Sequence, residues 1–172
     1  MNLREEILKE HSKAQRDKII KWVGNSQLRF DELFRLFLND EYRVAQRASW
    51  PVSYCVEVYP EFIQHHLKEL LQNLEKPNLH DAIKRNTVRI LQEIPIPEKY
   101  HGQVMNICFG YVENPTEAVA IKAFSLTVLG NLAIQYPEII PEIKLLIEDQ
   151  LPHQTAAFKS RAKRLMKEFK GS

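Results

Sequence analysis

The sequence predicts an all-α fold, a right-handed superhelix of about four helix pairs plus an N-terminal capping helix or helices. Apolar residues recur at spacings of three and four through most of the chain, and a small residue returns at intervals of 36 to 39 residues. No strand-like alternation of apolar and polar residues precedes a turn signal. The chain has 172 residues and is 44% hydrophobic, so we expect a single domain over residues 1–172.

Residues 1–24 are predicted to form the N-terminal cap, as one or two helices. A partial apolar stripe runs from Leu3 to Val23, and Ser12 is placed to cap the second part of it. Gly24 provides a stop signal for the segment. We expect this segment to cover the open end of a stack of helices.

Four later segments share one pattern and are predicted to be the second helices of four pairs. Their first apolar residues stand 39, 36 and 39 residues apart, at Val44, Ile83, Val119 and Phe158. The residue four positions further on is small in all four, namely Ala48, Thr87, Ala123 and Ala162. A small side chain there allows a neighbouring helix to approach closely, and a larger one would overpack the contact.

The first helices of these pairs are predicted at about residues 26–38, 60–74, 98–112 and 137–150. Apolar residues in them recur at spacings of three and four, so each has one buried side. Pro60, Pro97 and Pro137 stand near the starts of three of them, where the missing N–H of proline costs nothing. The four helix pairs together are predicted to occupy residues 26–170. Pro51 lies inside the second helix that contains Val44 and is expected to kink it.

These repeats resemble HEAT repeats, and the resemblance covers about residues 26–170. It implies a non-enzymatic interaction or scaffold module that binds a protein or an acidic segment on a concave face formed by the second helices. The resemblance specifies a fold much better than a partner.

A basic ridge with one aromatic pair is predicted along that face. On a helical wheel, four residues of the first of these helices fall within about 60° of one another beside the apolar stripe, namely Arg43, Arg47, Trp50 and Tyr54. The aligned positions of the later helices continue the ridge with Asn86, Arg89, Lys122, Arg161 and Arg164. Arginine beside aromatic residues suits either carboxylates or phosphates.

Two interpretations of these bases remain open. They bind an acidic partner, or they lie over apolar surface and pair with helix ends and neighbouring repeats. The same alternatives apply to residues 153–172, which hold six Lys and Arg residues against Glu168 alone. These bases form either a polar end cap or a patch for nucleic acid or an anionic membrane.

Catalytic motifs are lacking in the sequence, and we expect no enzyme, no cofactor and no metal site. There is no glycine-rich phosphate loop and no zinc-binding spacing of His and Cys residues. His66 falls on an apolar stripe and is expected to be a satisfied core or interface residue. Cys55 and Cys108 are expected to be reduced core thiols. With no signal peptide and no membrane span, we expect a cytoplasmic location.

A protein partner is therefore the first expectation, and nucleic acid is the alternative, bound through the basic ridge and the C-terminal helix. In its boldest form the alternative is a protein similar to the HEAT-like DNA glycosylases. Those enzymes need a carboxylate beside the aromatic residues of the concave face. Glu57 is the nearest acidic residue after Trp50 on that helix, and the helical wheel turns it elsewhere.

Overall fold

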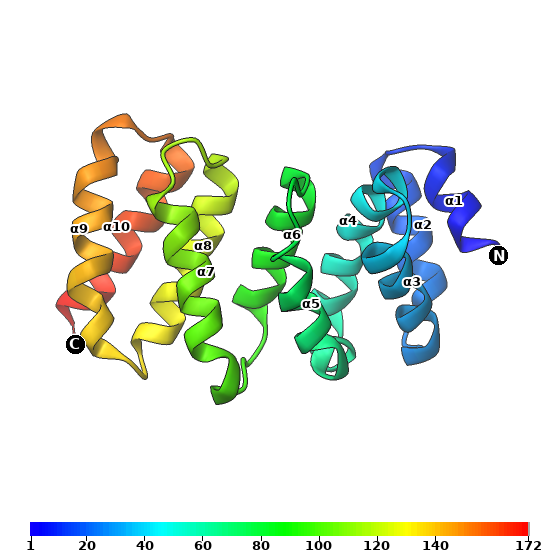
Figure 1. The fold of residues 1–172 in the computed structure, drawn as a ribbon, viewed down its shortest axis with the longest axis horizontal. Coiled ribbons are helices and arrows are strands. Elements are labelled where there is room, and N and C mark those ends of the chain that lie inside the picture. The colour runs from blue at the N-terminus through cyan, green and yellow to red at the C-terminus, as the bar shows by residue number, and fades with distance from the viewer. Residues whose placement is uncertain (172) are drawn as a thin grey trace. The chain divides into compact units, whose positions relative to one another are not determined.

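The computed structural model describes residues 1–171, which form ten α-helices and short 3-10 segments without any strand (Figure 1). The α-helices are α1 (Leu3–Lys9), α2 (Lys13–Val23), α3 (Gln27–Asn39), α4 (Tyr42–Val58), α5 (Leu67–Asn73), α6 (Asp81–Glu93), α7 (His101–Glu113), α8 (Val119–Ala133), α9 (Ile140–Gln150) and α10 (Ala156–Lys170). The 3-10 segments are η1 (Pro60–His66), η2 (Glu98–Tyr100), η3 (Pro137–Ile139) and η4 (Leu151–His153). The predicted all-α repeat architecture is confirmed.

The chain divides into two compact units, Met1–Ile94 and Pro95–Ser172. The first contains α1 to α6, and the second contains α7 to α10. The single domain expected over residues 1–172 stays a prediction.

The N-terminal segment forms two helices that both pack against α4. The Ser12 hydroxyl accepts a hydrogen bond from the backbone N–H of Gln15 at 3.1 Å, as expected of an N-cap. Gly24 ends α2 with φ of 54°, a left-handed value that a residue with a Cβ rarely adopts. Both predicted helix signals are therefore confirmed.

The four anchor positions of the repeat lie within or at the start of α4, α6, α8 and α10. The small residues four positions later are all buried, namely Ala48, Thr87, Ala123 and Ala162. The second helices pack in sequence within each unit, α4 against α6 in the first and α8 against α10 in the second. The alignment therefore identified the side of each helix that contacts its neighbour.

The first helices differ from the expectation at their N-termini. Three of the four open with a 3-10 turn, so that residues 60–74 are η1 followed by α5. His66 lies at this junction, half-buried, with its Nε2 atom 2.6 Å from Oδ1 of Asp31. Its ring centroid is 4.5 Å from that of Phe34. The prediction of a satisfied interface histidine is confirmed.

Helix α4 continues without interruption past the buried Pro51, so the proline does not end it. The hydroxyls of Ser49 and Ser53 donate to the carbonyls of Gln46 and Trp50 three residues back, at 2.7 and 2.8 Å. The kink expected at Pro51 stays a prediction.

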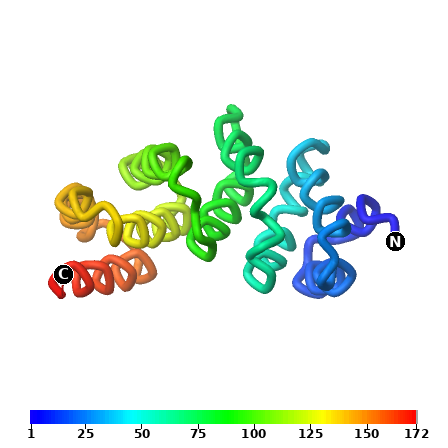
Figure 2. The backbone as a smooth tube through the Cα atoms, turned by 90° about the horizontal axis from the view of Figure 1, so that it is seen from below, coloured from blue at the N-terminus to red at the C-terminus, as the bar shows by residue number. Residues whose placement is uncertain are grey.

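In the second unit, α10 lies beside α8 and α9 (Figure 2). Gly130 of α8 faces Leu165 of α10 so closely that a Cβ at position 130 would overlap the leucine side chain. The glycine here therefore serves a close helix contact rather than a turn. Phe158, in the first turn of α10, is fully buried and belongs to the core of this unit.

Candidate interaction surface

An arginine–aromatic cluster of Arg16, Trp50, Tyr54 and Arg89 forms where three helices of the first unit meet. Trp50 and Tyr54 stand one turn apart on α4, with ring centroids 6.4 Å apart and planes at 74°. Both rings are half-buried. This edge-to-face arrangement is one that aromatic pairs favour.

Two guanidinium groups lie over these rings. The Cζ atom of Arg16, on α2, is 4.6 Å from the Trp50 ring centroid and 4.1 Å from that of Tyr54. The Cζ atom of Arg89, on α6, is 4.0 Å from the Tyr54 centroid. Cation–π attraction of this kind stabilises a contact by about 0.5–2 kcal/mol, the more so when water is excluded.

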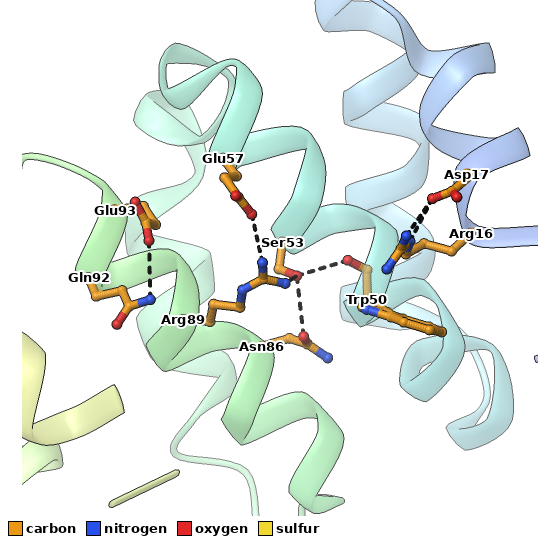
Figure 3. Close-up of polar contacts among 9 residues, drawn as sticks. All are labelled: Arg16, Asp17, Trp50, Ser53, Glu57, Asn86, Arg89, Gln92 and Glu93. Carbon is orange, nitrogen blue, oxygen red and sulfur yellow. Dashed lines mark hydrogen bonds and ion pairs between the residues drawn. The ribbon is translucent and has the colours of Figure 1, made fainter. Parts of the chain in front are cut away.

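Each arginine of the cluster has one carboxylate neighbour. Arg16 is only 8% exposed, and its Nε and Nη2 donate to Oδ1 of Asp17 at 2.8 and 2.6 Å (Figure 3). Arg89 donates from Nη2 to Oε2 of Glu57 at 2.6 Å (Figure 3). The carboxylates Asp17 and Glu57 are exposed, so each pair is open to water on its acidic side.

A buried polar network lies under the cluster and joins α4 to α6. Asn86 is 4% exposed, and its amide nitrogen donates to Oγ of Ser49 at 2.9 Å and to the carbonyl of Ala82 at 2.8 Å. Its Oδ1 accepts from the Ser53 hydroxyl at 3.2 Å (Figure 3). Asn86, predicted as a ridge residue, therefore packs between two helices.

The other two predicted ridge residues of the first unit differ in exposure. Arg47 donates from Nη1 to the backbone carbonyls of Leu8 at 2.9 Å and Ile7 at 3.4 Å. These carbonyls belong to the last turn of α1, where a cation complements the helix dipole. Arg43, one turn earlier on α4, is exposed. Arg47 thus holds α1 in place, and Arg43 faces solvent.

The three predicted ridge residues of the second unit, Lys122, Arg161 and Arg164, also separate. Lys122 is 2% exposed and donates from Nζ to Oε1 of Gln150 at 2.9 Å. Burial lowers the pKa of this lysine, and the nearby Glu117 partly opposes the shift. Lys122 is therefore part of the interior and presents no charge on an open surface.

Arg161 connects α10 to α8. Its Nη1 donates to Oγ1 of Thr127 at 2.8 Å and to the carbonyl of Ala123 at 3.2 Å, and its Cζ lies 4.7 Å from the Phe124 ring centroid. Arg164, one turn along, is exposed and lies 3.9 Å from the Glu168 carboxylate. Only Arg164 of these three residues is directed fully to solvent.

The nine predicted residues thus divide according to their position in the repeat. The residues that stand three positions after an anchor residue all bond to neighbouring elements. They are Arg47, Asn86, Lys122 and Arg161. The rest are Arg43 and Arg164, which are exposed, and Trp50, Tyr54 and Arg89, which are half-buried in the arginine–aromatic cluster. Arg16 belongs with the aromatic pair but was missed, because nothing in the repeat pattern connects α2 with the exposed side of α4.

Other reactive groups lie inside the units. Cys55 and Cys108 are buried, as expected, and burial raises the pKa of each thiol to about 12, so both stay neutral near pH 7. No group of three or more potential metal ligands occurs within residues 1–171. None of the helices described is long and apolar enough to cross a bilayer.

The helix pairs and their interlocking second helices define an α-helical repeat protein. The HEAT repeat domain family matches residues 3–169, and the chain belongs to this family. The match includes α1 and α2, so the N-terminal segment is part of the domain as well as its predicted cap. Neither the curated proteins nor the solved structures include a significant match.

Proposed function

We propose that the chain is a non-enzymatic interaction module that binds an acidic segment of a partner protein on the first unit. The observation that carries this proposal is the arginine–aromatic cluster on α2, α4 and α6. HEAT repeats are protein-interaction modules as a class, which supports a protein partner in general. Which face of the chain binds, and that the partner segment is acidic, are proposed from the cluster and not from the family.

An acidic segment with an apolar or aromatic residue suits this cluster. The half-buried Arg89 guanidinium, stacked on Tyr54, presents flat apolar surface together with N–H donors at its edge. Half-buried Trp and Tyr beside Arg is the composition found at energetic hot spots of protein interfaces. The exposed Arg43 adds a further cation on α4 for a carboxylate of the partner.

A phosphate backbone suits the cluster less well. Asp17 and Glu57 lie directly against its two arginines and would repel a closely spaced row of phosphates. A peptide can place its carboxylates away from these two acids, and its backbone N–H groups can donate hydrogen bonds to them. We therefore place nucleic acid second and include it in the test.

The experiment measures fluorescence anisotropy of a labelled peptide of glutamate and phenylalanine, and of a single-stranded oligonucleotide of equal charge, at 50 and 200 mM salt. We expect the peptide to bind, and Trp50→Ala to weaken binding by on the order of 2 kcal/mol, or about thirtyfold. Arg43→Glu should weaken it as well. The proposal is wrong if neither substitution changes the affinity for the peptide.

A second arginine–tryptophan pair in the same unit provides the control. The Cζ atom of Arg29 lies 5.3 Å from the Trp22 ring centroid, away from the cluster. Arg29→Glu and Trp22→Phe should leave the affinity unchanged within about twofold. If the oligonucleotide binds instead and loses about a hundredfold in affinity over this salt range, the partner is nucleic acid.

A further inference from the structure

A groove runs between α9 and α10 in the second unit. Its volume is about 290 Å³. Its floor is apolar and is made by Ile147, Leu151, Ala162 and Met166. Ile147 and Ala162 are buried and continue the core, while Met166 is half-buried. Methionine is flexible and polarizable, which lets such a floor adapt to an inserted side chain.

The two walls of this groove carry opposite charge. Lys163, Lys167 and Lys170 stand along α10 at spacings of four and three residues, so they share one side of the helix. All three are exposed. Glu148 stands on the α9 wall and is exposed as well. The lysine row spans seven residue steps along the helix, or about 10 Å, which is two helical turns.

We propose that this groove binds an amphipathic helix of a partner protein that carries an acidic row along one flank of its apolar face. Apolar side chains at spacings of three and four would lie on the floor formed around Met166, as in other helix-in-groove contacts. Carboxylates on the flank would meet the three lysines over two turns. The charge of each wall thus fixes which way the helix lies across the groove.

Charge complementarity favours this occupant over an anionic membrane or a polyphosphate. A bilayer presents a broad, uniformly negative surface, whereas this site is a concave groove with Glu148 on its second wall. The carboxylate of Glu148 would oppose a uniform anion and accept a basic or polar group on the second flank of a peptide. Only an occupant with unequal flanks satisfies both walls.

The proposal is independent of the one made for the first unit, because none of its residues belongs to the arginine–aromatic cluster. The methionines provide a direct test. The chain contains only three, Met1, Met105 and Met166, so a methyl-labelled sample gives three NMR signals. Met166 reports on the groove, and Met105 on α7 reports on the rest of the same unit.

The probe is an 18-residue peptide with leucine at every third or fourth position and glutamate along one flank. We expect it to shift the Met166 methyl signal in a saturable way and to leave Met105 in place. Replacing all three groove lysines, as K163Q, K167Q and K170Q, should weaken binding tenfold or more. Glu148→Lys should strengthen binding of a peptide with glutamate on both flanks.

Two controls separate this site from general electrostatics. The matched substitutions K13Q, K21Q and K68Q remove three exposed lysines from the first unit and should change the affinity by less than twofold. A peptide of the same composition with leucines and glutamates scattered around the helix should bind at least tenfold more weakly.

Three results would overturn the proposal. The scattered peptide could bind as well as the ordered one, or the ordered peptide could leave the Met166 signal unchanged. Vesicles of phosphatidylcholine and phosphatidylserine in a ratio of 3 to 1 could instead perturb Met166 in a way that depends on the groove lysines while the ordered peptide does not. The last result would assign the groove to a membrane surface.

Discussion

The two units connect their neighbouring second helices by different chemistry. Between α4 and α6, the contact is a buried polar network around Asn86, with Arg89 closing its outer side. Between α8 and α10, the contact is a close approach of Gly130 to Leu165, with Arg161 bonded to the backbone of α8. The first contact is thus dominated by buried side-chain hydrogen bonds, and the second combines a steric fit with hydrogen bonds from one arginine.

The two contacts together show what a polar residue at a repeated position does. Asn86 and Arg161 occupy the same place in the repeat, three residues after the anchor, and each donates to the preceding second helix. The position requires a donor of sufficient length rather than a charge. A surface for a partner must be sought further around the helix, where Trp50, Tyr54 and Arg89 lie.

The largest effect is expected from breaking the polar contact with Asn86→Ala. The substitution removes the partner of Ser49 and Ser53 in a buried place, at a cost of about 1–3 kcal/mol in the free energy of unfolding. Urea denaturation followed by circular dichroism measures the loss. Asn106→Ala, on an exposed position of α7, serves as the control and should stay within about 0.5 kcal/mol.

A somewhat smaller effect is expected from Gly130→Ala at the steric contact. The new methyl group overlaps the terminal carbons of Leu165, which must shift within a packed core, and we expect a loss of about 1–2 kcal/mol. Thermal denaturation measures it. A neutral result would show that Leu165 has room to move.

At two glycines of α7, in the same unit, we expect alanine to stabilise the fold and not to destabilise it. A Cβ at Gly102 or Gly110 meets no atom within 4 Å. Alanine there should raise the free energy of unfolding by about 0.5–1 kcal/mol, because it restricts the unfolded chain without a clash. The sign of the effect therefore distinguishes a glycine needed for packing from one that is merely present.

Much of the fold was predictable from local signals. The apolar anchors and the small residues four positions later follow from helical periodicity alone. The helices α4, α6, α8 and α10 confirm this prediction. Ser12 and Gly24 act through their own backbone and nearest neighbours, so their roles were predictable as well. The 3-10 turns at Pro60 and Pro137 were not, since proline at a helix start is compatible with either winding.

The depth of side chains was much less predictable than their direction. A helical wheel gives the angle of Lys122 on α8 but not the presence of Gln150 on α9 beside its ammonium group. The same limit hid Arg16, whose contact with Tyr54 depends on how α2 packs against α4. Contacts between elements decide these cases, and a single sequence carries no local signal for them.

A further test concerns Arg47, which was predicted on the ridge and bonds to the end of α1. Arg47→Met keeps the apolar stem and removes the donor to Leu8 and Ile7, so we expect a loss of about 1 kcal/mol. Hydrogen exchange should show the loss first in the amides of α1. Arg43→Met, one turn earlier on an exposed position, should leave these amides unchanged; equal effects would contradict the assigned role.

The smallest effect is a pH dependence that concerns α1 and α2 alone. Glu6 of α1 accepts hydrogen bonds from Lys18 at 2.7 Å, from Lys9, and from Gln15 at 2.9 Å. These bonds, led by that of Lys18, lower the pKa of Glu6 to about 2, against an ordinary value of 4.5. The carboxylate therefore stabilises the folded state above pH 4.5.

This contribution should be lost as the pH falls from 4.5 toward 2. In that range Glu6 takes up a proton in the unfolded chain but stays ionised in the folded state, so the unfolded state gains stability relative to the folded one. Hydrogen exchange of the α1 amides at pH 5, 4 and 3 measures it. Glu6→Gln should flatten the dependence, whereas Glu5→Gln, exposed on the same helix, should not. An unchanged profile in Glu6→Gln would place the acid sensitivity outside the α1–α2 contact, for example in the ion pair between Arg4 of α1 and Asp40.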